Sequence, residues 1–265
     1  MASSEILVGT SGFSFSDWKG AVYPESLPSS EWLSWYAARL RFVELNVTFY
    51  RMPDERFLQR LLERVPAGFR FAIKANRSLT HEIATDWHGA LESFRSAIRP
   101  IMTAGRLEAT LFQFPYRFHY SGSNRRYLAA LCEAASDLTP AIEFRHSEWF
   151  RDSVYEGLRR REATLVWPDL PRLRNLPRLR PIVTTPRGYL RLHGRNSQTW
   201  WSGTNESRYH YRYSDDELRE LNQEIAPVLP ELETLVVAFN NHFEGNAFFN
   251  AVAFDSILHG QSSSL

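Results

Sequence analysis

Short apolar runs recur eight times along the chain, and most of them end in charged or amide residues. Segments with helical spacing lie between most of these runs. Short apolar runs of this kind are typical of buried parallel strands, and their alternation with helices is typical of an α/β fold. The pattern predicts a single TIM-like (β/α)8 barrel over residues 1–265. The predicted strands cover residues 6–11, 42–46, 71–76, 110–114, 141–145, 164–169, 189–194 and 235–241.

Apolar residues three and four positions apart predict the helices that connect these strands. Ser214 and Glu217 match a capping box at the start of one of them. One connection differs: residues 170–186 contain four prolines and no helical stripe, so the sixth crossover is expected to be irregular. The helices are expected near residues 30–40, 57–65, 91–102, 127–135, 154–158, 214–225 and 247–258.

Composition narrows the class of protein. A length of 265 residues suits one α/β barrel and requires no second domain, and 43% hydrophobic residues can bury a sizeable core. The single cysteine, Cys132, lies at a helix-spaced apolar position and is expected to be a core residue in a reducing compartment. No signal-type or membrane-spanning run is present, so we expect a cytoplasmic protein with no membrane partner.

Polar residues at the strand ends indicate where a site would lie. Because side chains alternate along a strand, two residues two positions apart share a face. In a barrel, the carboxyl ends of the strands carry the active site. The same-face pairs are Glu44 with Asn46, Lys74 with Asn76, Glu143 with Arg145, and Arg191 with His193.

Three of these residues are candidates for catalysis. Glu44 and Glu143 lie on roughly opposite sides of the predicted barrel, and two carboxylates in unlike surroundings suit general acid and base work, with Glu44 as the preferred base. The chain has only two lysines, Lys19 and Lys74. Lys74, at a strand end, could bind an anion, act as nucleophile or donate a proton if burial lowers its pKa. The alternatives are a structural Lys74–Glu44 pair and a Glu143 carboxylate that only pairs with Arg145.

The remaining strand-end residues suggest what the site would bind. Arginine side chains bind phosphate or carboxylate through bidentate hydrogen bonds, side-chain amides orient hydroxyls or base edges, and aromatic rings stack on sugars or bases. The implied ligand is small, anionic and sugar-containing. The candidate binding residues are Asn46, Tyr50, Gln113, Arg145, Asp169, Arg191, His193, Asn240 and Asn241.

Several segments resemble the YecE-like family, also known as the domain of unknown function 72, whose members are (β/α) barrel proteins. The resemblance extends over nearly the whole chain and implies the fold, but it supplies no established reaction. Where the family usually has an acidic residue, this chain has His242. This difference argues against any mechanism that needs a carboxylate just after the eighth strand. The segments that carry the resemblance are residues 8–13, 18–20, 43–50, 69–74, 80–81, 111–115, 142–146, 190–194, 213–214 and 239–241.

The leading hypothesis from the sequence is an acid/base enzyme, hydrolase-like, that acts on an anionic sugar-containing or nucleotide-like substrate. No metal is part of it, and no cofactor is expected because Gly9 and Gly12 lack the spacing of a phosphate-binding loop. A second hypothesis is a nucleic-acid or anion-binding protein without turnover. It would use the arginine-rich residues 172–187 and an aromatic loop over residues 195–213, which has the length of a lid.

A third hypothesis is a metal-dependent phosphodiesterase, endonuclease or sugar isomerase. It would place a metal on Glu44, Glu143, Asp169 or His193. The sequence alone leaves the oligomeric state open.

Overall fold

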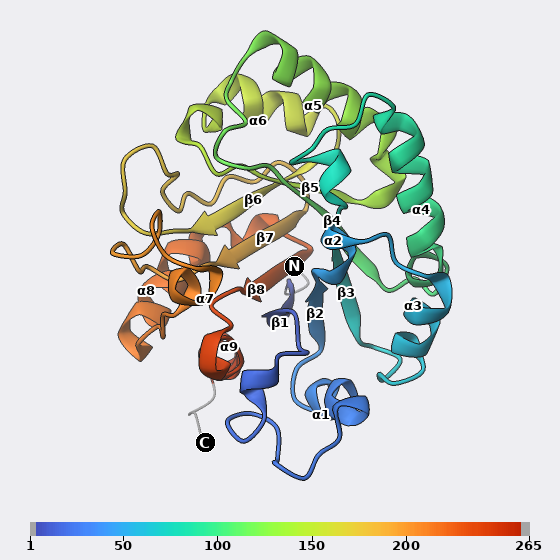
Figure 1. Cartoon of the computed structure of the whole chain (residues 1–265). Helices are drawn as coiled ribbons and strands as arrows, with labels where there is room; N and C mark the ends of the chain where they lie inside the picture. The colour runs from blue at the N-terminus through green and yellow to red at the C-terminus, as the bar shows by residue number, and fades with distance from the viewer. Residues whose placement is uncertain (1–3, 261–265) are drawn as a thin grey trace.

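All eight predicted strands are present, and they form a closed parallel barrel in the computed structural model, which describes residues 4–260 (Figure 1). Each strand pairs with its neighbour in the chain, and the last pairs with the first, from Glu5↔Thr234 to Thr10↔Phe239. The strands are β1 (Glu5–Ser11), β2 (Phe42–Leu45), β3 (Arg70–Lys74), β4 (Leu107–Gln113), β5 (Pro140–Glu143), β6 (Thr164–Asp169), β7 (Arg187–Leu192) and β8 (Thr234–Phe239).

The predicted helices surround this barrel (Figure 1). The capping box is confirmed: the Ser214 hydroxyl accepts from the Glu217 amide, while the Glu217 carboxylate accepts from the Ser214 amide. Two short helices, α2 and α7, were not predicted because each is at most five residues long. The helices are α1 (Trp32–Ala37), α2 (Val47–Tyr50), α3 (Glu55–Leu62), α4 (Trp87–Thr103), α5 (Gly122–Ala134), α6 (Asp152–Arg159), α7 (Asn205–Tyr209), α8 (Asp215–Ile225) and α9 (Asn246–Leu258).

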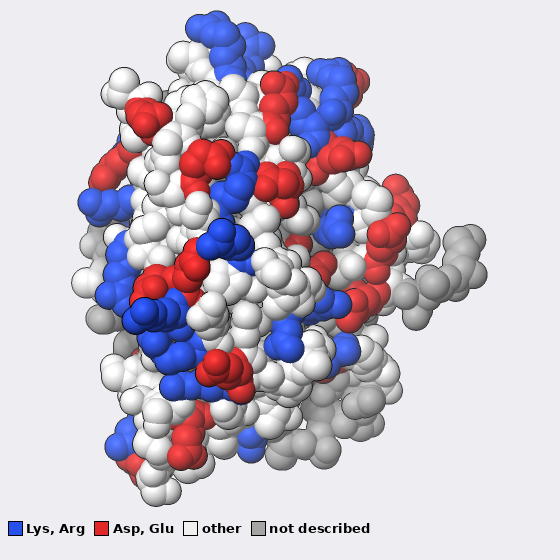
Figure 2. All heavy atoms as spheres, turned by 90° about the vertical axis from the view of Figure 1, so that its right-hand side faces the viewer, with Lys and Arg blue, Asp and Glu red and all other residues white. Residues whose placement is uncertain are grey.

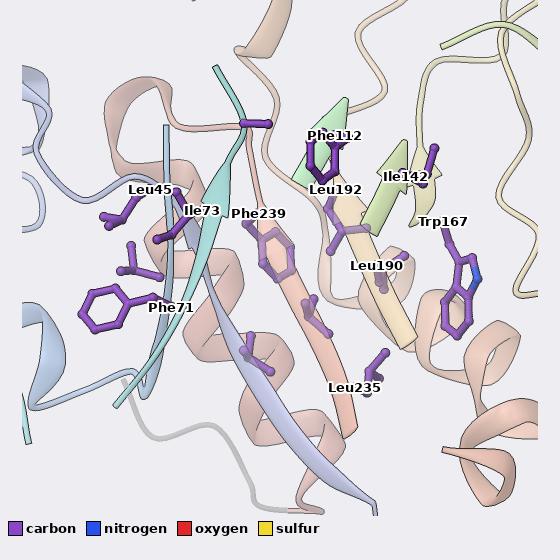
Figure 3. Close-up of a cluster of buried hydrophobic side chains, with 14 of the residues drawn as sticks. Leu45, Phe71, Ile73, Phe112, Ile142, Trp167, Leu190, Leu192, Leu235 and Phe239 are labelled. Atoms are coloured by element: carbon purple, nitrogen blue, oxygen red, sulfur yellow. The ribbon is translucent and has the colours of Figure 1, made fainter. Parts of the chain in front are cut away.

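Two apolar clusters hold the barrel together. The larger one lies between strands and helices and includes Leu45, Ile73 and Phe239, which project from three different strands (Figure 3). The smaller one draws on all eight strands and on no helix, which places it inside the barrel. Its members are mostly small residues, with Phe42 and Tyr189 as the large ones. The barrel interior is therefore closed by apolar packing below the polar strand ends.

A glycine allows two strands of the barrel to approach closely. Gly9 pairs with Phe42 in the β1–β2 register. A Cβ atom at Gly9 would lie 2.0 Å from the Phe42 carbonyl oxygen, which no real side chain can do. A residue other than glycine would have to push β1 away from β2.

The irregular sixth crossover is confirmed, since no helix connects β6 to β7. A side chain of the crossover instead bonds to the backbone at the start of β6: the Thr184 hydroxyl accepts from the Leu165 amide and donates to the Ala163 carbonyl, both at 2.8 Å. Leu170 and Leu176 from this crossover pack against Trp200 from the loop that follows β7. The two segments expected to contain a basic patch and a lid therefore form one packed unit.

The surface over α3 and α4 carries both signs of charge, interspersed across the face (Figure 2). One pair links the two helices directly, with Arg99 Nη2 at 2.9 Å from Glu55 Oε1. A surface of this kind has no single-sign patch to attract a polyanion. Among the described residues, no helix combines the length and the apolar character needed to cross a membrane.

Candidate active site

Arg191 lies at the centre of the polar strand ends and contacts both predicted carboxylates. Its Nε and Nη2 donate to the two oxygens of Glu44, at 2.8 and 2.6 Å, in a bidentate pair. Its Nη1 donates to Glu143. The hydroxyl of Tyr189 donates to Glu44 Oε2 at 2.5 Å, and Arg191 Nη2 also reaches Ser11 Oγ at 3.3 Å. One arginine on β7 thus joins strands β1, β2 and β5 across the barrel.

These buried charges hold each other ionised. Burial alone would raise the pKa of Glu44, but the charge and hydrogen bonds of Arg191 outweigh it, and the pKa lies below its usual value. Burial acts in the same way on Glu143, where Arg145 and Arg191 hold the pKa well below its usual value. Arg145 pairs with Glu143 through its Nε. Two arginines and two glutamates therefore cancel in charge, and neither carboxylate is poised to exchange a proton near neutral pH.

His193 extends the network as a neutral ring. Burial lowers its pKa to about 3, and the Arg145 charge acts in the same direction against the opposing Glu143. Its Nδ1 lies 3.0 Å from Asn240 Nδ2 and 3.4 Å from Arg145 Nη2, and both of these atoms are donors. We therefore assign the proton to Nε2, which lies 3.1 Å from Glu143 Oε1 and donates to it.

Lys74 differs from every other charged residue at these strand ends. Among residues 4–260 it forms no ion pair with a carboxylate, and its Nζ lies over the Phe49 ring, 4.2 Å from the centroid. The side chain is partly exposed. Thr48 fixes the backbone here, since its hydroxyl donates to the Lys74 carbonyl at 2.5 Å. The alternative of a structural Lys74–Glu44 pair is not what the structure contains, because Arg191 occupies both oxygens of Glu44.

The surroundings of Lys74 favour its neutral form. Burial lowers its pKa to about 7, and Arg191 and Arg145 act in the same direction, while Glu44 and Glu143 oppose them. An amine with this pKa is half deprotonated near neutral pH, which suits a nucleophile or a proton-transfer group.

His81 also contacts Phe49 and feels the positive charge of Lys74. Its ring lies 4.8 Å from Phe49 in an edge contact, and its Nδ1 is 3.0 Å from the Thr80 hydroxyl. Burial lowers its pKa to about 4, and nearby Lys74 is the next cause. From the sequence alone, His81 just beyond a strand could be a proton shuttle or a surface histidine, and its position relative to Phe49 depends on loop geometry that no pattern reveals.

Four of the predicted binding residues lie near the strand ends but differ in burial and in hydrogen bonding. Asn46 directly precedes α2, and its Oδ1 is buried without a partner among the described residues. Gln113 donates to the Phe114 carbonyl at 2.9 Å. Tyr50 is 68% exposed on α2. Asn241 is fully buried and braces the backbone, with Nδ2 donating to the Tyr211 carbonyl at 2.8 Å.

Asp169 belongs to a separate network. Arg195 Nε donates to both of its oxygens, at 3.2 and 3.0 Å, and the Tyr213 hydroxyl donates to Oδ2 at 2.6 Å. Arg195 also reaches Glu217 at 3.3 Å, so this network ties the β7–α8 loop to the start of α8. Within the described part of the chain, Glu44, Glu143, Asp169 and His193 do not form a group with metal-ligand spacing.

Tyr189 is the site residue that sequence reasoning missed. A usable signal was present, because it lies two positions before Arg191 on the same strand and therefore shares its face. Its hydroxyl donates a further hydrogen bond to Glu44, and burial raises the pKa of Tyr189 well above the usual value. It therefore serves as a neutral donor.

Comparisons with known proteins fit this architecture. The model of the family described as "Protein of unknown function DUF72" matches residues 7–265. The chain belongs to this DUF72 family. Among curated proteins, the DUF72 chain is 28% identical to the UPF0759 protein YunF of Bacillus subtilis, with 98% of this chain and 97% of that protein covered.

Solved structures of the same family have the same barrel. A DUF72 family protein from Thermotoga maritima (TM1631) is 40% identical, with a TM-score of 0.90 and coverage of 96% of this chain and 99% of that one. A DUF72 family protein from Enterococcus faecalis (EF0366) is 25% identical, with a TM-score of 0.84 and coverage of 98% and 97%. The names of these relatives state a family and no reaction.

Proposed function

We propose that this DUF72 protein is an acid/base enzyme of the hydrolase type, with Lys74 as its proton-transfer group or nucleophile. Its substrate is small, anionic, and sugar-containing or nucleotide-like, and it binds at the carboxyl end of the barrel. The observation that carries the proposal is the isolation of Lys74: a partly exposed amine with a pKa of about 7, unpaired among residues 4–260, beside a set of buried charges that cancel.

Proton transfer belongs to Lys74 and not to the glutamates because a general acid or base works best when its pKa lies near the working pH. The pKa values of Glu44 and Glu143 are lowered by arginines that also hold both carboxylates in place. Their role in the proposal is to position Arg191 and Arg145 and to prevent the buried site from accumulating too much positive charge.

The field at the site supports an anionic substrate. When Lys74 is protonated, it adds a positive charge to a neutral group of four, and cations also contribute to the lowered pKa values of His81 and His193. A phosphate or carboxylate beside Lys74 and Arg145 would relieve this excess. Gln113 and Asn240 would then supply amide groups to orient hydroxyls.

The test uses the fact that the chain has two lysines. Reductive methylation with ¹³C-formaldehyde labels Lys74, Lys19 and the α-amine of the chain, and the two lysine signals are assigned by their loss in Lys74→Arg or Lys19→Arg; the signal that persists in both variants is the α-amine. Lys19 is the internal reference because it is half exposed and lies 3.8 Å from Glu25. We expect the Lys74 signal to titrate near pH 7 and to move to higher pH when inorganic phosphate is added.

Turnover is tested separately on a panel of nucleoside monophosphates and sugar phosphates. Lys74→Arg keeps a positive charge but cannot deprotonate, so it should retain phosphate binding and lose turnover, while Lys19→Arg should change neither. A Lys74 signal that titrates above about pH 10, or a Lys74→Arg variant that turns over any substrate as fast as the wild type, would contradict the proposal.

One observation favours the second candidate, a nucleic-acid or anion-binding protein without turnover. Arg172, Arg174, Arg178 and Arg180 are all exposed on the sixth crossover. If they bind a phosphate backbone, binding of a single-stranded oligonucleotide should weaken steeply with salt, and replacing these arginines by glutamine should reduce both the affinity and the slope. Lys74→Arg should leave this binding unchanged, which separates the two candidates.

A further inference from the structure

Three side chains at the carboxyl end of the barrel, outside the Arg191 network, lie at the spacing of metal ligands. They are His119 from the β4–α5 loop and His146 and Glu148 from the segment after β5. Their potential ligand atoms all lie within 4.8 Å of one another. We propose that His119, His146 and Glu148 bind a divalent transition-metal ion of the Zn²⁺ type, with at least one coordination position left for water or an anion.

Two of the three separations fit tetrahedral coordination. Zn²⁺ binds imidazole nitrogen and carboxylate oxygen at about 2.0–2.2 Å, so two ligands of one tetrahedral ion lie roughly 3.3–3.5 Å apart. Glu148 Oε2 lies 3.3 Å from His119 Nδ1 and 3.6 Å from His146 Nδ1. The carboxylate therefore lies close enough to both imidazoles to share one ion with them, and the third separation, between the two histidines, is no more than 4.8 Å.

The chemical state of the residues also fits a metal. His146 is buried, with 3% of its surface exposed, so its ring is held in place by the surrounding packing. Its Nδ1 carries a lone pair and no proton, since it accepts from the Glu148 amide at 3.2 Å, and an ion bound at Nδ1 would replace this long hydrogen bond. The Tyr120 amide donates to Glu148 Oε2 at 3.2 Å and fixes the carboxylate. This amide plays the part of the outer hydrogen-bond partners that orient metal ligands.

The surroundings suit access from solvent. The Tyr116 ring packs 4.7 Å from His146, and the partly exposed Trp201 ring packs 4.9 Å from Tyr116. Glu148 and His119 are both exposed. With two histidines and one carboxylate as protein ligands, the set matches the three-ligand class that keeps an open position.

A second histidine and glutamate pair in the chain provides a matched control. His210 Nε2 lies 3.3 Å from Glu244 Oε2, and both side chains are about as exposed as His119 and Glu148. This pair has no third ligand, since among the described residues only the set around His146 has metal-ligand spacing. An exposed histidine pairs with a carboxylate both at His119–Glu148 and at His210–Glu244. We propose a metal site only at the first pair, where His146 adds a third ligand.

The experiment titrates chelator-stripped protein with Zn²⁺, and with Co²⁺ as a coloured substitute. The variants His119→Ala and Glu148→Gln change exposed positions and should fold, which circular dichroism checks. We expect one ion per chain, at least about 100-fold weaker binding in both variants, and no change in His210→Ala, since even outer-shell changes commonly cost about 10- to 100-fold. No stoichiometric binding to the wild type, or binding that survives His119→Ala or falls equally in His210→Ala, overturns the site.

Discussion

The lowered pKa of Lys74 has a consequence for stability that can be worked out from the structure. In the unfolded chain the ammonium keeps its ordinary pKa of 10.5, whereas in the folded protein the pKa is about 7. Between these values the unfolded chain binds more protons, so this residue opposes folding at low pH and stops opposing it as pH rises through the window. Lys74→Met keeps the length of the side chain and removes the charge.

The magnitude follows from the two pKa values. A difference of one in pKa corresponds to about 1.4 kcal/mol. Below pH 7, protonated Lys74 therefore lowers the free energy of unfolding by at most about 5 kcal/mol. Solvent screens a partly exposed ammonium, and the contact with Phe49 contributes about 0.5–1 kcal/mol in the opposite sense. We expect Lys74→Met to raise the free energy of unfolding by about 2–3 kcal/mol near pH 6, with the gain shrinking as pH approaches about 10.

Urea unfolding followed by tryptophan fluorescence, at several pH values between about 6 and 10, measures the difference directly. Lys19→Met is the matched control, because Lys19 is half exposed and its replacement should change stability only slightly. If Lys74→Met is no more stable than the wild type near pH 6, or if its advantage is the same at both ends of the range, the pKa of Lys74 is not lowered in the folded protein.

Three further changes test other parts of the structure, each measured by urea unfolding. Arg191→Met leaves two buried carboxylates without their shared partner and should destabilise by about 3–5 kcal/mol, and adding Glu44→Gln should recover part of the loss; no loss in the single variant would contradict the network. Tyr213→Phe removes the donor to Asp169 and should lose about 1–3 kcal/mol, with a neutral result arguing against that bond. Gly9→Ala places a methyl group 2.0 Å from a carbonyl oxygen of the next strand and should prevent folding, so a variant with normal stability would show that the strands can separate.

The barrel itself could be predicted from the sequence because its signals are local. Each strand is a short apolar run, and alternation assigns Arg191 and His193 to one face without any knowledge of the rest of the fold. The irregular sixth crossover was also predictable, since its prolines exclude a helix. Both expectations are confirmed by the closed barrel and by the missing helix between β6 and β7.

Which charges would pair could not be predicted, because pairing depends on distances across the barrel. Arg191 and Glu44 are separated by 147 positions, and the tilt of the strands brings them into contact. The same geometry leaves Lys74 without a carboxylate partner in the described chain and assigns Asp169 to Arg195. A list of strand-end residues therefore identifies the members of the site but not their roles.

The Arg191 network also limits how this chain can evolve. Its four charges cancel only as a set, so losing any one of them leaves a buried charge that the other three do not neutralise. Most single replacements must therefore pass through a less stable protein before a second change compensates. Related sequences should keep the four residues together or exchange several at once, and a family alignment would show them as a block that varies jointly.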